Sequence, residues 1–356
     1  MAIQPLRPTA PSTAPVPHRA EPPAGPTVQI DPERIRHLTE REAARLNDRT
    51  PASAAAFARA ERALVGGVPS SYQRRAPYPI YLERGAGQYV WDVDGHQYLD
   101  VHNGVGSMVQ GHAHPTITEA VERRMRLGSH FAAPTEDAYI VAELLAERWK
   151  LPRWRFVNSG SEATMDAIRL ARAFTGRDGV MKIFGSYHGH HDYVMVDIGL
   201  SVYEMGDRDN YPSLAYGKGI PDAVTQMTIA VPFNDAPALE RRLERLHAEG
   251  NLPACLIMEA ALMNCGVILP EPGYLDEVRR ITKKYGVLWI VDEVKTGLTV
   301  AAGGATELFG IRPDLVCLAK ALGAGIPTGA IGGTDEVWQP VLDGDVYMVG
   351  TFNGNP

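Results

Sequence analysis

From residue 115 onward, short apolar runs alternate with segments whose apolar positions recur every three or four residues. The apolar runs predict strands at 154–157, 179–185, 228–233, 255–260, 287–293 and 314–319. The periodic segments predict helices at 136–149, 161–176, 236–249 and 273–286. Strands that are apolar at nearly every position, alternating with helices, indicate an α/β fold with a mostly parallel sheet covered on both faces.

The first third of the chain has a different pattern. Residues 31–65 predict a helix, with Asp31 as N-cap and scattered apolar positions among charges. Residues 81–101 alternate between apolar and polar and turn at Asp94–Gly95, which predicts a β-hairpin. Residues 1–27 contain eight prolines and predict a disordered tail.

Composition excludes several classes of partner. The 356 residues are 45% hydrophobic and carry a net charge of −7 without a recurring basic cluster, which argues against nucleic acid or an anionic membrane as a partner. The chain has no apolar run long enough to span a membrane and no secretory signal. Its three cysteines lack CxxC spacing, which favours buried free thiols in a reducing compartment and therefore a cytoplasmic protein.

Ligands of parallel α/β sheets bind at the carboxyl ends of the strands, so the residues that follow each strand are the candidates for chemistry. After the strand at 154–157 comes NSGSEA, where Gly160 permits a tight turn into a helix. The backbone amides of Gly160, Ser161 and Glu162 would then form an anion site suited to a phosphate. A plain Ser or Asn helix cap is the alternative interpretation.

Two charged residues also follow apolar strands. Asp292 ends the strand at 287–293, where a buried carboxylate needs a cationic partner, although a cap or salt bridge would explain it too. Lys320 is the only charge between Asp314 and Asp335. A desolvated lysine becomes a nucleophilic amine that can form a Schiff base, whereas a lysine on an exposed edge would only extend to solvent.

The loop after the strand at 179–185 reads SYHGHH. Tyr187 could lie flat on an aromatic ligand. A metal site at the histidines is disfavoured, because no carboxylate or cysteine sits at ligand spacing. A phosphate site, a flat aromatic side chain, a strand-end Asp and a strand-end Lys together suit a phosphorylated aldehyde with a basic ring nitrogen, which is pyridoxal phosphate.

Several motifs also carry a family resemblance. The segments NSGSEA, YHGH, VDEVKTG, LAKALGAGIPTGAIGG and GTFNGNP, with GQYVWDVDGHQYLD and GHAHP upstream, resemble the class III (ω-type) pyridoxal-phosphate-dependent aminotransferases. The similarity extends from about residue 62 to 356 and is closest to the glutamate-1-semialdehyde aminomutase-like branch. The resemblance implies the fold-type I architecture of pyridoxal-phosphate-dependent transferases and a homodimer.

The resemblance implies a role for each residue around the ring. Lys320 would form the internal aldimine with pyridoxal 5'-phosphate and later carry a proton between Cα and C4′. Asp292 would keep the pyridine nitrogen protonated. Tyr187 and Val294 would pack on the two faces of the ring, and Asn264 would contact the ring hydroxyl.

Further residues are implied for the phosphate and the substrate. Ser159, Gly160 and Ser161 would bind the phosphate, and Thr351 would reach the phosphate of the neighbouring subunit. Arg74 would bind a substrate carboxylate, because a guanidinium can do so bidentately. Arg75 is adjacent and could take that role instead, and the pair could also be merely solvated.

The resemblance divides the chain into four parts. Residues 1–27 are the tail, 28–110 the N-terminal helix and small-domain segment, 111–340 the large cofactor-binding domain, and 341–356 the start of a dimer-contact segment. The rest of the small domain is expected to be absent. The chain departs from the branch in the polar and aromatic segment 196–221, and at Lys295 and Thr299.

The leading functional prediction is an aminotransferase that moves an amino group between an amino donor and a keto or aldehyde acceptor by ping-pong chemistry. An aminomutase or epimerase, which would need no second acceptor, is the first alternative. A non-catalytic homologue is the second. A nicotinamide-dependent oxidoreductase is set aside, because no GxGxxG follows a strand, and no GxxxxGK[ST] phosphate loop occurs either.

Overall fold

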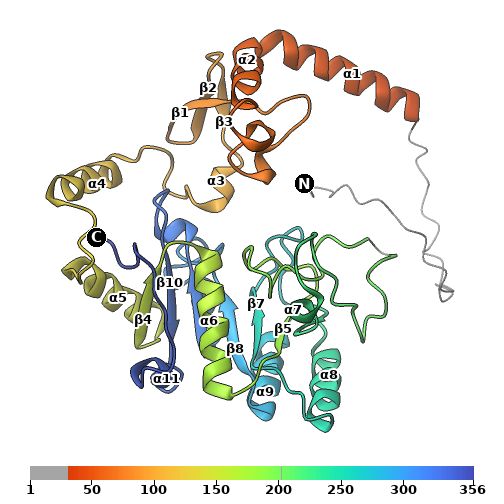
Figure 1. Cartoon of the computed structure of the whole chain (residues 1–356), viewed down its shortest axis with the longest axis vertical. Helices are drawn as coiled ribbons and strands as arrows, with labels where there is room; N and C mark the ends of the chain where they lie inside the picture. The colour runs from red at the N-terminus through yellow and green to blue at the C-terminus, as the bar shows by residue number, and fades with distance from the viewer. Residues whose placement is uncertain (1–30, 202) are drawn as a thin grey trace. The chain divides into compact units, whose positions relative to one another are not determined.

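The computed structural model describes residues 31–201 and 203–356 (Figure 1). The predicted disordered tail, 1–27, lies outside the described residues. The chain divides into two compact units, Met1–Val101 and His102–Pro356, and each is described by itself. No helix in the described part of the chain is long and apolar enough to cross a membrane.

The first unit contains helices followed by a small antiparallel sheet. The elements are α1 (Pro32–Arg49), α2 (Pro51–Ala60), η1 (Val65–Gly67), η2 (Ser71–Gln73), β1 (Leu82–Ala86), β2 (Tyr89–Asp92) and β3 (Gln97–Leu99), with strand order β1-β2-β3. The prediction of one helix over 31–65 is wrong, because the helix breaks at Thr50. Pro51 lacks an amide hydrogen and disfavours a helical backbone in the residue before it.

The predicted hairpin turn at Asp94–Gly95 is confirmed and joins β2 to β3. Asp94 accepts hydrogen bonds from the amide of Ala52 (2.7 Å) and from the amide of Ser53 (2.9 Å). These are among the first amides of α2, which have no carbonyl partner inside the helix. The turn therefore also caps the helix that precedes it in the sequence.

The second unit is built on a seven-stranded sheet of order β4-β10-β9-β8-β7-β5-β6. The strands are β4 (Arg153–Val157), β5 (Val180–Ile183), β6 (Thr228–Val231), β7 (Cys255–Met258), β8 (Leu288–Asp292), β9 (Leu315–Leu318) and β10 (Gly329–Gly333). Strands β5 to β9 pair in parallel, whereas β10 pairs antiparallel with both β9 and β4. All six predicted strands and the mostly parallel sheet are confirmed.

The helices of this unit include the four that the sequence predicts. They are α3 (Asn103–Gly106), α4 (Pro115–Leu127), α5 (Glu136–Trp149), α6 (Gly160–Thr175), α7 (Asp222–Thr225), α8 (Ala236–Ala248), α9 (Tyr274–Tyr285), α10 (Gly304–Leu308), η3 (Lys320–Leu322) and α11 (Gln339–Leu342). The predicted end of α6 at Gly176 is confirmed, since this glycine caps the helix with φ 67°.

Strand β10 is absent from the sequence prediction because its sequence is GAIGG. The glycines are there for close packing: a Cβ at Gly332 would come within 2.5 Å of the Trp154 indole. A Cβ at Gly329 would come within 2.7 Å of the Ser159 carbonyl oxygen. A strand with glycines in place of larger side chains lacks the run of apolar residues by which strands are predicted from sequence.

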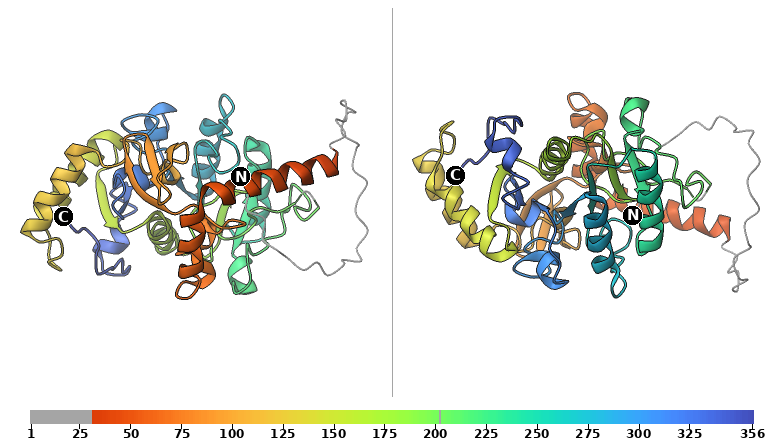
Figure 2. Two further views of the ribbon diagram at one scale, coloured as in Figure 1. Left: turned by 90° about the horizontal axis from the view of Figure 1, so that it is seen from above. Right: turned by 90° about the horizontal axis from the view of Figure 1, so that it is seen from below.

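The sheet is apolar on both faces because side chains alternate along each strand. On β8, Leu288 and Ile290 pack with α6 and α11, whereas Trp289 and Val291 pack with α5, α8 and α9. Figure 2 shows α6 and α9 on opposite sides of the sheet. Double coverage leaves the strand ends as the places where polar side chains of the sheet can reach a ligand.

Two of the three cysteines follow the prediction and one does not. Cys255 and Cys317 are buried free thiols in β7 and β9. Cys265 is exposed, because it lies in the loop after β7, where its thiol donates to the Gly185 carbonyl oxygen at 3.4 Å.

A buried carboxylate fixes the turn that follows β8. Glu293 is fully buried and accepts hydrogen bonds from the Trp149 indole (3.0 Å), the Thr296 hydroxyl (2.9 Å), and the amides of Ala305 (2.6 Å) and Thr306 (2.8 Å). The Thr306 hydroxyl donates as well. One side chain therefore ties the end of β8 to α5 and α10.

Replacing Glu293 should destabilise the second unit strongly. In Glu293→Ala, several buried donors lose their acceptor, and we expect the free energy of unfolding to fall by about 3–5 kcal/mol. Trp149→Phe removes one donor and should cost about 1 kcal/mol before the change in packing. Urea unfolding monitored by circular dichroism measures both. A Glu293→Ala protein as stable as Trp149→Phe would contradict this role.

Candidate active site

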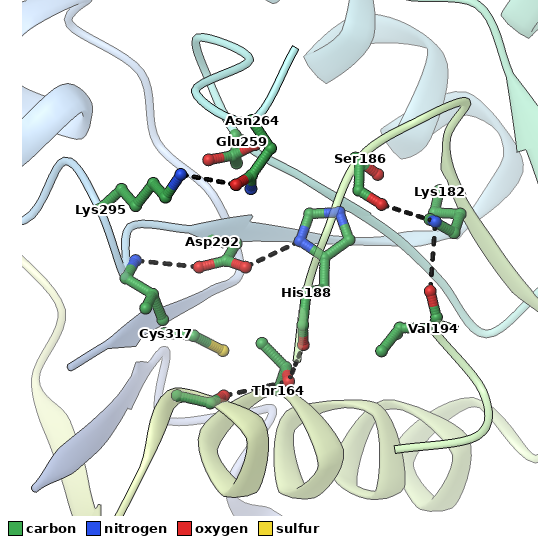
Figure 3. Close-up of polar contacts among 12 residues, drawn as sticks. Thr164, Lys182, Ser186, His188, Val194, Glu259, Asn264, Asp292, Lys295 and Cys317 are labelled. Carbon is green, nitrogen blue, oxygen red and sulfur yellow. Dashed lines mark hydrogen bonds and ion pairs between the residues drawn. The ribbon is translucent and has the colours of Figure 1, made fainter. Parts of the chain in front are cut away.

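Four neighbouring parallel strands, in the order β9-β8-β7-β5, bring their carboxyl ends together. Lys320 follows β9, Asp292 ends β8, Glu259 follows β7, and Tyr187 and His188 lie in the loop after β5. Figure 3 shows Asp292 beside His188, with the Lys295–Asn264 pair and Glu259 above them. The structure therefore gathers at one edge the polar residues that the sequence places after separate strands.

Asp292 is buried, and both of its carboxylate oxygens have partners. One accepts a hydrogen bond from the Val294 amide at 2.9 Å, and the other lies 2.7 Å from Nδ1 of His188. Burial lowers the pKa of His188, against the attraction of Asp292. At neutral pH the imidazole is therefore neutral, and its Nδ1–H donates to the carboxylate. Each carboxylate oxygen can accept a second hydrogen bond.

Lys320 begins η3 with φ 50°, in the left-handed region, where a lysine is unusual. Burial lowers its pKa, and the charge of Lys295 lowers it further, whereas Asp292 and Glu259 oppose the shift. A larger fraction of the amine is then neutral and nucleophilic at neutral pH than in an exposed lysine. The strained backbone and the partly buried amine make Lys320 a candidate functional residue.

The loop after β5 is held by a second buried lysine, Lys182. Its Nζ donates to the carbonyl oxygens of Ser186 (2.8 Å), Val194 (3.2 Å) and Val196 (2.7 Å), and the side chain is inaccessible to solvent. Burial lowers the pKa of Lys182 to about 7, while Asp197 opposes this shift. Lys182 closes the segment 186–196 onto the strand and thereby fixes the backbone that carries Tyr187 and His188.

The N-terminus of α6 lies beside this loop and beside Lys320. The Ser159 hydroxyl accepts from the Glu162 amide at 3.2 Å, while the amides of Gly160 and Ser161 belong to the first helical turn and have no carbonyl partner within the helix. A Cβ at Gly160 would come within 2.9 Å of Val294 and 3.5 Å of the Ala319 side chain. The glycine therefore permits three elements of the site to meet.

The loop after β5 also approaches this helix end closely. The amide of His190 donates to the Ser161 hydroxyl oxygen at 3.2 Å. A Cβ at Gly189, whose φ is 107°, would lie 2.7 Å from the Ser161 Cα. This contact fixes the Ser161 side chain and leaves its hydroxyl proton available to a ligand.

The Asn264 amide and the Lys295 ammonium group lie near Asp292 as well. Nζ of Lys295 donates to Oδ1 of Asn264 at 2.6 Å. Glu259 lies near them and is almost fully buried, and burial raises its pKa to about 8, with Asp292 adding to the shift. Below that pH the carboxyl of Glu259 is mostly neutral.

The other predicted residues are placed as follows. Tyr187 is 38% exposed, and its pKa is raised by burial, with smaller contributions from Tyr216 and Asp292. Thr351 is exposed in the last segment of the chain, and Arg74 follows η2 in the first compact unit. The roles of Thr351 and Arg74 stay predictions.

Three residues of this edge were missed from the sequence: Lys182, His188 and Glu259. His188 belongs to the HGHH cluster, and one ring nitrogen of this residue contacts Asp292. Lys182 interrupts an otherwise apolar run, VMKIF, just as Lys320 interrupts another. Lys182 therefore shows the same sequence signal as Lys320. Among the described residues, no group of three His, Cys, Asp or Glu side chains is placed to hold a metal.

The loop that carries Tyr187 and His188 should open when Lys182 is replaced. In Lys182→Met three buried carbonyl oxygens lose their donor, at a cost of about 1–3 kcal/mol each when they stay buried. We expect amides of residues 185–197 to exchange hydrogen at least about tenfold faster, as measured by mass spectrometry. Lys218→Met, at an exposed position, is the matched control. Unchanged hydrogen exchange in Lys182→Met would contradict the role of Lys182 in holding this loop.

Comparison with known proteins agrees with this geometry. The sequence profile of the class III aminotransferases matches residues 71–356. The chain belongs to the class III aminotransferase family. It is 43% identical over 311 residues to the glutamate-1-semialdehyde 2,1-aminomutase of Methanopyrus kandleri, covering 87% of this chain and 70% of that protein. The predicted resemblance and fold class are confirmed.

Solved structures give the same result. An omega-transaminase from Sphaerobacter thermophilus superposes with a TM-score of 0.81 at 39% identity, covering 86% of this chain and 70% of that one. A glutamate-1-semialdehyde aminomutase from Pseudomonas aeruginosa in complex with PMP gives 0.80 at 28% identity, covering 91% and 72%. The predicted cofactor, pyridoxal phosphate, is confirmed as that of the family.

The residues of this class III enzyme suit that cofactor. An amine with a lowered pKa can hold an aldehyde. A buried carboxylate with remaining acceptor capacity can hold a protonated ring nitrogen. The start of a long helix, with unpaired amides and a glycine at the closest approach, can hold a phosphate.

Proposed function

We propose that this protein is an aminotransferase that moves an amino group between an amino donor and a keto or aldehyde acceptor by ping-pong chemistry. The observation that carries the proposal is the pairing of a buried carboxylate, Asp292, with an amine of lowered pKa, Lys320, on adjacent parallel strands. The start of α6 lies next to both, since Gly160 is close to Val294 and Ala319.

Bound pyridoxal phosphate supplies an electron sink for the electrons released at the substrate Cα. Lys320 would hold the cofactor aldehyde in the absence of substrate. With its amine free, Lys320 would take a proton from the substrate Cα and return a proton at C4′. The lowered pKa of Lys320 makes the neutral, proton-accepting form more abundant at neutral pH.

Asp292 has the complementary task of keeping a proton on the ring nitrogen. Its carboxylate is held by the Val294 amide and by His188, so it is oriented before the cofactor binds. Because His188 is neutral, it orients Asp292 without cancelling the negative charge that attracts the ring proton. His188 is thus a positioning residue, and Asp292 is a catalytic one.

The remaining assignments belong to the same proposal. Ser159, Gly160 and Ser161 bind the phosphate, Tyr187 and Val294 cover the ring faces, and Asn264 contacts the ring hydroxyl. Arg74 binds a substrate carboxylate, and Thr351 reaches the phosphate of the second subunit in a cytoplasmic homodimer. The N-terminus of α6 and the strand ends support the assignments to the phosphate and the ring. The family motifs support the assignments of Arg74, Thr351 and the dimer.

An aminomutase is the second candidate, favoured by the 43% identity to a protein named glutamate-1-semialdehyde 2,1-aminomutase. The two activities use the same residues but differ in stoichiometry. An aminotransferase consumes a donor and an acceptor, whereas an aminomutase converts one substrate alone. Conversion of a single amino substrate without added acceptor, followed by mass spectrometry, would favour the aminomutase.

The attachment site can be mapped directly. After incubation with pyridoxal phosphate and reduction with borohydride, we expect the mass of the reduced adduct on Lys320. Lys320→Ala should abolish this adduct, and Lys218→Met, which removes an exposed lysine, should not. An adduct spread over surface lysines, with none on Lys320, would contradict the proposal.

Asp292 should matter for rate more than for binding. Asp292→Asn should lower kcat by about 10²- to 10³-fold, because the ring nitrogen loses the charge that keeps it protonated. Asp276→Asn removes an exposed carboxylate and should leave kcat unchanged. Steady-state kinetics with saturating cofactor measures both, and a kcat for Asp292→Asn within a factor of two of wild type would contradict this role.

A further inference from the structure

A second lysine, Lys295, stands at the same edge of the sheet. It lies three residues after Asp292, and its Nζ is 2.6 Å from Oδ1 of Asn264, a contact drawn in Figure 3. The charge of Lys295 also acts on the Glu259 carboxyl, where it opposes the rise in pKa that burial causes. The site therefore contains a positive charge that the proposed chemistry of Lys320 and Asp292 does not use.

The backbone on both sides of Lys295 is fixed. The amide of Val294 donates to Asp292 at 2.9 Å, and the Thr296 hydroxyl donates to the buried carboxylate of Glu293 at 2.9 Å. The amide of Gly297 donates to the Glu293 carbonyl oxygen at 2.8 Å. Because these anchors hold the turn, the Lys295 side chain starts from a defined point and can reach Asn264 reproducibly.

The contact with Lys295 determines the orientation of the Asn264 side-chain amide. An ammonium group can only donate hydrogen bonds, so its partner must be the amide oxygen. The contact with Lys295 occupies one lone pair of that oxygen and fixes the orientation of the amide, so that Asn264 can offer its NH₂, a donor, to a ligand. A donor beside a ring hydroxyl favours the ionised oxygen over the neutral one.

We propose that Lys295 is a positioning residue that presents the Asn264 amide as a donor to the ring oxygen of the cofactor and places a positive charge at the edge of the sheet where Lys320 lies. This inference rests on the proposed function, because it assigns Asn264 to the cofactor ring.

The charges around Lys320 agree with this role. Besides burial, the groups that act on its amine are Asp292 and Glu259, which raise its pKa, and Lys295, which lowers it. Burial raises the pKa of Glu259 to about 8, so at neutral pH the opposing charge comes mainly from Asp292. Lys295 offsets part of that attraction and keeps more of the Lys320 amine neutral, the form that attacks an aldehyde.

The first test uses the cofactor-free protein. The rate at which acetic anhydride labels Lys320, mapped by mass spectrometry across pH, gives the pKa of that amine. Lys295→Met should raise it and should slow labelling at pH 7.5 by about threefold or more, because less of the amine is then neutral. Lys295→Arg, which keeps the charge, and Lys218→Met, which removes an exposed one, should label at the wild-type rate.

An unchanged labelling profile for Lys320 in Lys295→Met would overturn the charge effect. If Lys295 had only a structural role, Lys295→Met would leave the labelling profile of Lys320 unchanged as long as the protein folds correctly. Hydrogen exchange of the turn at 293–297 monitors that folding. Slower labelling in Lys295→Arg as well as in Lys295→Met would contradict an effect of charge.

The second test adds pyridoxal phosphate and measures its dissociation constant in Lys295→Met, Asn264→Ala and the double variant. If Lys295 acts through Asn264, the two substitutions should be strongly non-additive, with the double variant close to Asn264→Ala. Additive losses would overturn the positioning role. Failure of the wild type to form a Lys320 adduct would contradict the proposed function instead, so the two failures are distinguishable.

Discussion

Every part of the site depends on burying charged groups at the carboxyl ends of adjacent parallel strands. Lys320, Asp292 and Glu259 follow β9, β8 and β7, and each is removed from most of the solvent. Buried charges are costly unless they are paired or hydrogen-bonded, so the surrounding loops are constrained to supply partners. The same desolvation that makes the arrangement costly also adjusts the proton affinities on which the chemistry depends.

Two further buried ionisable groups stabilise the loops of the site. Glu293 ties the turn after β8 to α5 and α10 through its five donors. Lys182 ties the loop after β5 to its own strand through three carbonyl oxygens. Neither group contacts the reacting atoms in the proposal. They determine where Asp292, Val294 and the residues after Ser186 can lie, and thereby make the site rigid before a ligand binds.

The sequence predicts the sheet well because its strands are buried on both faces and therefore apolar at nearly every position. It does not predict β10, whose glycines are required by Trp154 and Ser159 across the sheet and leave no local signal. It predicts Asp292 and Lys320 because each interrupts an apolar run. It does not predict His188, which depends on a contact across 104 residues. It does not predict the break at Thr50 either, because Pro51 lies within a pattern that is otherwise helical on both sides.

The central claim is that Lys320, Asp292 and the start of α6 form one binding site for pyridoxal phosphate. A crystal structure of the protein grown with pyridoxal phosphate tests it most directly. We expect continuous electron density from the Lys320 Nζ to the cofactor, with Asp292 at the ring nitrogen and the phosphate at the amides of Gly160 and Ser161. Cofactor density on another lysine, or a phosphate distant from α6, would contradict it.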